Sequence, residues 1–247
     1  TLRFGAHCWM DAPASLCSQG LQVLPQATIE YRLREFPMQR LQGFWSEDFD
    51  WDAQAQADID LQLGDQGPLG RLDVQVAAGN LRVREEGEWL LLPYEQLQLN
   101  SRLTPRAINS KLQFRAPELG RLELQAQLDP GRPDLPMRGS YLIQDVDVAA
   151  LRPFFPLLSE LAGSMQGQGE LSGSLLAPVA SGHLRLRDGR VAGETLPLTI
   201  EQLQLDMLLV GQRMLLNGSW QSGEQGRARL QGELNWREAL TLDLQLN

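Results

Sequence analysis

The sequence of 247 residues predicts an all-β protein. Apolar and polar residues alternate through most of the chain, so that Leu203, Leu205 and Met207, for example, are separated by polar residues. A period of two places successive side chains on opposite faces of a strand. Short clusters rich in Gly, Pro and Asp, such as 64–70, separate the alternating runs as turns do. With one exception, no run shows the period of a helix.

The expected strands follow one another from the first residues to the last. Alanines in 51–63 would suit a helix, but their alternation with Gln and Asp favours a strand. Pro37 and Gly43 predict a corner or short helical turn in 36–45. The alternating runs are 2–6, 19–24, 27–34, 51–63, 71–76, 80–84, 88–92, 97–99, 108–114, 122–128, 139–148, 163–175, 179–187, 203–209, 214–220, 228–236 and 240–246.

One segment breaks the alternation and predicts a short helical stretch near 149–161. Asp147 is placed to cap its start, and Pro153 and Pro156 would interrupt a regular helix. The stretch is apolar enough to pack over the edge of a sheet or the mouth of a groove. The alternative is a connector that fills a corner of the core.

The last four strands carry the strongest functional signal, because each presents one apolar and one polar face. Water contact would be costly for so many apolar side chains, at roughly 2 kcal/mol each, so something must cover them. An ordinary sandwich core formed with a second sheet is one cover, and a bound apolar ligand is another. The candidate binding residues are Leu203, Leu205, Met207, Leu216, Trp220, Leu230, Leu234, Trp236, Leu242 and Leu244.

Composition excludes several classes of protein. The formal net charge is −9, the pI is about 4.8, and Lys111 is the single lysine. No basic stripe with interleaved aromatics occurs, so we expect no nucleic acid binding. No run approaches the ~20 apolar residues of a membrane-spanning helix. We expect one continuous domain over 1–247, with a sub-boundary near 129–162 as the alternative, cut from a longer protein.

The two cysteines, Cys8 and Cys17, flank a loop that contains Pro13. A disulfide between them would indicate an oxidising compartment and would stabilise the fold by roughly 2–3 kcal/mol. Two free buried thiols are the alternative. Only His7 lies near enough to join them, so we expect no metal site.

No residue pattern predicts catalysis. The glycines of 167–173 have the spacing G-x-G-x-x-x-G and lack the following helix of a dinucleotide loop. His7 and His183 occur in neither a metal-ligand nor a triad spacing. The aspartates at 145 and 147 predict solvated carboxylates rather than a calcium site, and 45–51 predicts a polar loop with structural tryptophans rather than a sugar site. We therefore expect no enzyme and no cofactor.

Several short motifs together resemble the TamB family of the translocation and assembly module of Gram-negative bacteria. These motifs are Cys8-Trp9 with Leu16-Cys17, Leu-Arg-Pro-Phe-Phe-Pro at 151–156, Gly163, Gly-Glu-Leu-Ser-Gly at 169–173, Pro178, Gly-His-Leu-Arg-Leu at 182–186, and Gly-Arg-Ala-Arg-Leu-Gln-Gly-Glu-Leu-Asn-Trp at 226–236. The family's N-terminal anchor and extreme C-terminal end are missing, so the chain resembles an internal or C-terminal-half fragment.

The resemblance implies an elongated, U-shaped twisted sheet, or β-taco, with a hydrophobic inner groove. It implies a periplasmic location, with the parent protein anchored in the inner membrane and spanning the cell envelope. It also implies two roles: phospholipid transport, with acyl chains in the groove, and outer-membrane protein assembly with TamA, a barrel protein that would be met through parts outside this chain.

Three hypotheses remain. The first is a bridge segment that shields acyl chains on the apolar faces of the strands. The second is a chaperone-type module that holds unfolded outer-membrane strands on the same faces or by adding them to a sheet edge. The third is a scaffold with a closed sandwich core.

Overall fold

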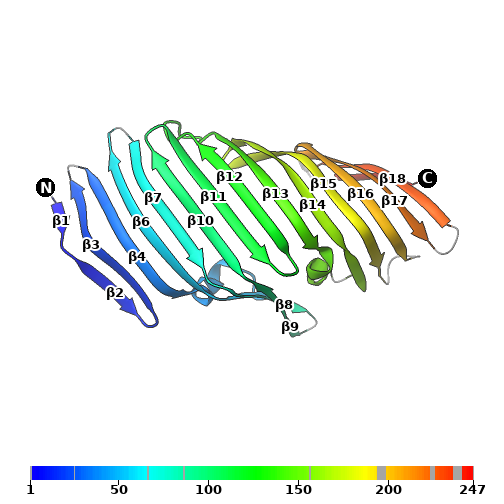
Figure 1. The fold of residues 1–247 in the computed structure, drawn as a ribbon, viewed down its shortest axis with the longest axis horizontal. Helices are drawn as coiled ribbons and strands as arrows, with labels where there is room; N and C mark the ends of the chain where they lie inside the picture. Colours follow the sequence, from blue (N-terminus) through cyan, green and yellow to red (C-terminus); the bar gives the residue numbers. More distant parts are fainter. Residues whose placement is uncertain are drawn as a thin grey trace.

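The computed structural model describes residues 2–24, 26–65, 67–85, 87–155, 157–193, 199–222, 226–235 and 241–246. One large open antiparallel sheet dominates the fold, and its strands follow one another along a twisted, elongated body (Figure 1). Neighbours in the sheet are nearly all neighbours in sequence, because short turns connect antiparallel strands. The predicted all-β fold is confirmed.

The strands of the large sheet are numbered along the chain. They are β1 (Leu2–Phe4), β2 (His7–Asp11), β3 (Ala14–Leu24), β4 (Ala27–Pro37), β6 (Gln54–Gly64), β7 (Gly67–Val76), β10 (Gln96–Thr104), β11 (Ala107–Ala116), β12 (Gly120–Leu128), β13 (Met137–Asp147), β14 (Glu160–Ser174), β15 (Ala177–Ala192), β16 (Ile200–Gly211), β17 (Arg213–Ser222), β18 (Gly226–Asn235) and β19 (Thr241–Leu246). Both β1 and β2 pair with β3, at different ends of that strand.

A second layer lies against one end of this sheet. It consists of the three-stranded sheet β5 (Phe49–Asp52), β8 (Gly79–Glu85) and β9 (Glu88–Tyr94), together with the 3₁₀ helices η1 (Met38–Phe44) and η2 (Val148–Phe154). In Figure 1 these elements lie along the lower end of the large sheet. Among the described residues, no helix is long and apolar enough to cross a membrane.

The helical predictions are confirmed, with shorter bounds. η1 falls within the corner expected at 36–45. η2 covers the start of the segment expected at 149–161, and Asp147 caps it, because the Ala149 N–H donates to Asp147 Oδ1 at 2.9 Å. η2 ends before Phe155, and strand β14 has already begun at Glu160.

Four of the β-bulges in the large sheet share a backbone feature. Each coincides with a non-glycine residue of positive φ, a conformation that occurs in bulges and increases the local twist. These residues are Glu35 on β4, Asp145 on β13, Asp188 on β15 and Gln202 on β16. Asp145 and Asp147 are both exposed, on either side of buried Val146, which confirms the prediction of solvated carboxylates.

The predicted disulfide is present. Cys8 on β2 and Cys17 on β3 are direct cross-strand partners, and their Sγ atoms are 2.12 Å apart. It fastens the edge strand β2, which Arg40 of η1 also holds through an ion pair with Asp11 at 2.6 Å. The ladder of backbone hydrogen bonds continues from β12 through β13 to β14, across 129–162. The number of domains stays a prediction.

Candidate apolar binding face

Strict register keeps the apolar side chains of many strands on one face of the large sheet, which we call the apolar face. Directly paired residues form rows that cross the sheet at right angles to the strands. One row runs through Ala57, Val74, Leu99, Leu112, Leu124 and Tyr141. The next row runs through Ala55, Val76, Leu97, Phe114, Leu122 and Ile143. The same rows continue into β14–β19.

The second layer covers only the lower end of this face. Met38 of η1 and Tyr94 of β9 are buried against Val76 and Ala55 of the large sheet. The Trp51 indole N–H donates to Tyr94 Oη at 2.9 Å, which joins β5 to β9. Above this strip, Val74, Leu99, Leu112 and Leu124 remain only partly buried. The apolar face is therefore neither a closed sandwich core nor fully exposed.

η2 covers the C-terminal part of the face in the same way. Val148 is buried with Leu186 and Leu203, and Leu205 and Trp220 pack around them. Leu203 keeps only 9 % of its surface exposed. Among the predicted binding residues, Leu203 therefore packs in the core under η2, and Leu205 and Trp220 border it.

The other predicted residues lie further along the rows. Leu230 and Leu234 on β18 and Met207 and Leu216 on neighbouring strands share the apolar face and are partly buried. Backbone register places Leu242 opposite Leu234 and Leu244 opposite Gly232 on β19, but the side chains of both leucines lie outside the described part. Trp236 lies outside the described residues altogether.

Glycines interrupt the rows in the middle of the face, and a tyrosine fills the gap. Gly169 on β14 and Gly182 on β15 are paired with each other and lie beside Tyr141 on β13. A Cβ added at Gly169 would come within 2.6 Å of Tyr141 Oη, so the ring lies where side chains would stand. Burial raises the pKa of the Tyr141 hydroxyl. Sequence reasoning missed this arrangement, because the glycines are informative only once the register is known.

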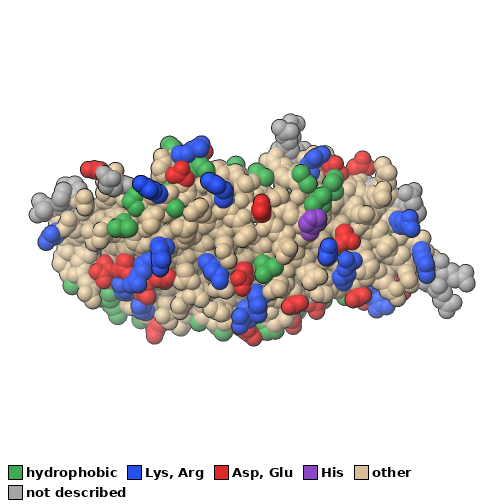
Figure 2. Space-filling view, turned by 45° about the horizontal axis from the view of Figure 1, so that its top comes forward, with side chains coloured by type: hydrophobic (Ala, Val, Ile, Leu, Met, Phe, Trp, Pro, Cys, Tyr) green, Lys and Arg blue, Asp and Glu red, His purple; other side chains and the backbone are tan. Residues whose placement is uncertain are grey.

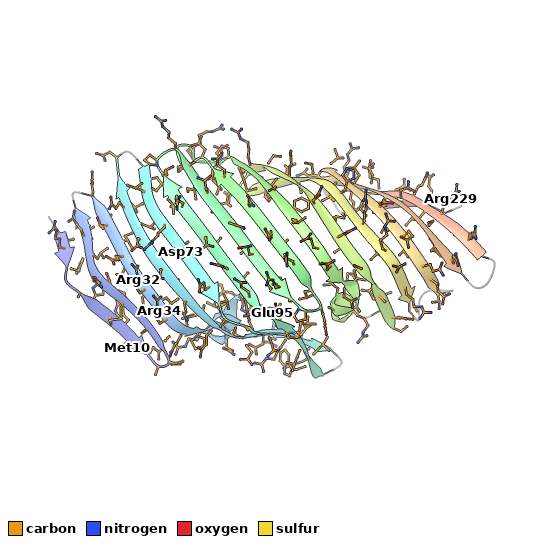
Figure 3. The ribbon with its side chains drawn as sticks, viewed as in Figure 1. Met10, Arg32, Arg34, Asp73, Glu95 and Arg229 are labelled. Carbon is orange, nitrogen blue, oxygen red and sulfur yellow. A yellow bond between two sulfur atoms is a disulfide. The ribbon has the colours of Figure 1, made fainter. Side chains whose placement is uncertain are left out.

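The opposite face of the sheet, which we call the charged face, carries many Lys, Arg, Asp and Glu side chains (Figure 2). Arg32 on β4 bridges Asp60 at 2.9 Å and Asp58 at 3.4 Å, and Arg34 pairs with Asp58 at 2.6 Å. Figure 3 shows both arginines on β4 with Asp73 two strands away on β7. The Asp60 carboxyl is partly desolvated, which raises its pKa, but its hydrogen bonds to Arg71 and Arg32 outweigh this effect and lower the pKa overall.

Two of the remaining candidate groups, His7 and Trp45, have structural partners. His7 Nε2 lies 3.1 Å from Tyr31 Oη. Trp45 packs on Phe49 and Trp51. Within the described part of the chain, no three His, Cys, Asp or Glu side chains are grouped in a way that could hold a metal ion.

The comparisons with known proteins identify one family. The family model described as "TamB, N-terminal domain" matches residues 1–186. The match ends within β15, so β16–β19, which carry the predicted binding residues that the structure describes, lie after the matched region. No solved structure matches the chain significantly.

Proposed function

The chain belongs to the TamB family, and from this premise we propose that its apolar face binds the acyl chains of phospholipids. The TamB family is a transport and assembly family whose members span the periplasm. The chain would serve as a bridge segment, along which phospholipids move between the inner and outer membranes. Its link to outer-membrane protein assembly with a TamA-like barrel would run through parts of the protein outside this chain.

Continuity of the apolar rows is the observation that carries the proposal. Neighbouring strands lie about 4.8 Å apart, and from β6 to β13 each apolar side chain in the two rows has an apolar neighbour on the next strand. An acyl chain that slides along a row loses contact with Leu99 as it gains contact with Leu112 and then with Leu124. Burial energy scales with the apolar area removed from water. The free energy along such a path therefore stays nearly level, without a deep well.

The second layer supplies an opposite wall at one end of the face. Tyr94 packs against Ala55 and Val76 of the large sheet and is 2 % exposed, and Leu92, which is 3 % exposed, packs with Val83 and with Ala150 of η2. A ligand would lie above this wall, on the partly buried side chains of the apolar face. These side chains lie between the lower strip, which the second layer covers, and the turns at the upper end of the sheet. Because those side chains are mostly leucine and valine, we expect weak selectivity for the lipid headgroup. The disulfide favours an oxidising compartment such as the periplasm.

A pair of neighbouring substitutions on β18 tests the proposal. Leu230→Arg places a charge on the apolar face, whereas Gln231→Arg places the same charge on the charged face, one residue away. Binding of a fluorescent phosphatidylethanolamine is measured by titration, and co-purified phospholipid by native mass spectrometry. We expect Leu230→Arg to weaken binding by about tenfold or more, because a charge in an apolar site is costly, and Gln231→Arg to bind as the parent does. Equal binding by two folded variants would refute the lipid-binding role.

The edge of the sheet supports a second candidate, a chaperone-type module. Within the described residues, β1 and β2 each pair only with β3, so their outer backbone edges are free to accept another strand. Photo-crosslinkers placed at Phe4 and at Leu112 distinguish the two functions. Crosslinks to an unfolded outer-membrane protein at Phe4, with none to lipid at Leu112, would favour the chaperone.

A further inference from the structure

The buried hydroxyl of Tyr141, on the apolar face, has no hydrogen-bond partner among the described residues. Tyr141 lies on β13, which is followed by β14 and β15 between the two ends of the large sheet (Figure 1). Other hydroxyls of this face are paired. Tyr31 Oη lies 3.1 Å from His7 Nε2. The hydroxyls of Ser101 and Ser110 lie 2.8 Å apart. The Tyr141 hydroxyl is therefore a polar group for which the described chain supplies no partner.

The surroundings of this hydroxyl are apolar. Along its row, Tyr141 has Leu124 of β12 on one side and Gly169 of β14 on the other. The row continues through Gly182 to Leu209. Burial raises the pKa of the Tyr141 hydroxyl, so the phenol keeps its proton at neutral pH and can donate a hydrogen bond. A buried donor without an acceptor is costly, and a ligand that brings an acceptor removes this cost.

The two glycines beside Tyr141 leave its ring room to move. A Cβ added at Gly169 would lie 2.6 Å from Tyr141 Oη, and one added at Gly182 would lie 2.8 Å from it. The ring thus occupies the space that side chains at these two positions would fill, and it can turn about its Cα–Cβ bond without displacing any side chain there. Because Tyr141 is only partly buried, such a turn brings the hydroxyl to the open part of the apolar face.

The ester group of a lipid has the chemistry that this hydroxyl lacks. An ester carbonyl is a neutral acceptor at the end of an acyl chain, whereas a phosphate is charged and costly to place in an apolar site. We propose that Tyr141 donates a hydrogen bond to the ester carbonyl of a lipid whose acyl chains lie along the apolar rows. This inference rests on the proposed binding of acyl chains, and it names the polar group of the lipid that the site recognises.

A single hydrogen bond makes Tyr141 a resting point on an otherwise nearly level path. Such a bond changes affinity by about two- to tenfold, which is too little to trap a lipid that must move on. The preference concerns the linkage between the acyl chain and the glycerol, because only an ester carries the carbonyl. It is therefore compatible with weak selectivity for the headgroup, which lies several bonds further from the acyl chains.

Titrations with two lipids and two variants test the inference. The probes are a fluorescent diacyl phosphatidylethanolamine and the diether lipid with the same chains and headgroup, which lacks the carbonyls. The measured quantity is the ratio of their dissociation constants. Tyr141→Phe should reduce the preference for the diester by about two- to tenfold relative to the parent chain, because it removes the donor and keeps the ring. Tyr31→Phe, on the same face but with a hydroxyl that pairs with His7, is the control and should keep the ratio of the parent.

Infrared spectroscopy of the bound diester detects the hydrogen bond itself. The ester carbonyl should absorb at a lower frequency in the complex with the parent chain than in the complex with Tyr141→Phe. Near-ultraviolet circular dichroism shows whether each variant is folded. An unchanged ratio in folded Tyr141→Phe, or the same carbonyl frequency in both complexes, overturns the role of Tyr141 and leaves acyl-chain binding intact. A parent chain that binds neither lipid would instead overturn the proposed function, and this inference with it.

Discussion

Removal of one hydroxyl group should loosen the second layer from the apolar face. Tyr94 is 2 % exposed, and its Oη accepts the Trp51 indole N–H at 2.9 Å. Tyr94→Phe keeps the ring and removes the acceptor, so the indole N–H of the partly buried Trp51 is left without this partner. An unsatisfied buried donor costs about 1–3 kcal/mol, and we expect the free energy of unfolding to fall by that amount.

Tyr141→Phe is the matched control. Both tyrosines have a pKa that desolvation raises, but the buried Tyr141 Oη has no hydrogen-bond partner among the described residues. Removal of a buried hydroxyl that makes no hydrogen bond relieves its desolvation cost. Tyr141→Phe should therefore leave stability unchanged or raise it.

Urea unfolding of the two variants and the parent, followed by tryptophan fluorescence, measures both effects. Desolvation raises the pKa of Tyr94 more than its bond to Trp51 lowers it. The native state therefore retains the proton where the unfolded state has lost it, and stability falls as the pH rises above about 10. Tyr94→Phe should remove part of that alkaline loss. Equal midpoints for Tyr94→Phe and Tyr141→Phe would refute the assigned role of the Trp51–Tyr94 bond.

Three other changes test separate parts of the sheet. Replacing both Cys8 and Cys17 by alanine should cost about 2–3 kcal/mol and should raise hydrogen exchange in β2 before other strands. Gly70→Ala should cost about 2 kcal/mol or more, measured by urea unfolding, because φ is 145° and the new Cβ would clash with the Asp60 carbonyl oxygen. Asp60→Asn should flatten the loss of stability in acid: its ion-paired carboxylate has a lowered pKa, so its contribution is present above about pH 4 and is lost as the pH falls further. Thermal unfolding at pH 3 and pH 6 measures this difference.

Alternation along the sequence was sufficient to predict the large sheet. Alternation within a single strand, as at Leu97 and Leu99, assigns its side chains to one of two faces. The apolar face is formed by the apolar sides of many such strands. Alternation could not predict the second layer. β8 and β9 alternate like any other hairpin, and only tertiary packing sends them out of the sheet and onto its face. The bulges at Glu35 and Gln202 were equally unpredictable, since neither residue type favours positive φ.

The sequence predicted that the candidate site is apolar, but not how many strands contribute to it. The last four strands show the most regular alternation, and the predicted binding residues were therefore placed on them. Leu112 and Leu124, on earlier strands, lie in the same kind of apolar row. Leu203 shows a second limit of prediction from alternation. It follows the same sequence pattern as Leu205, but η2 buries it. Periodicity reports which face a side chain occupies, whereas the packing of distant elements decides whether it can reach a ligand.

The two faces should respond differently to mutation, because only the apolar face is proposed to bind lipid. The rows extend beyond the region that matches the family, from Leu184 through Met207 to Leu216. A path for a mobile acyl chain depends on every step, so one charge in any row should impede it wherever it falls. A scan of charged substitutions along β15–β18 should therefore show loss of lipid binding at the apolar positions and unchanged lipid binding at the positions of the charged face that alternate with them.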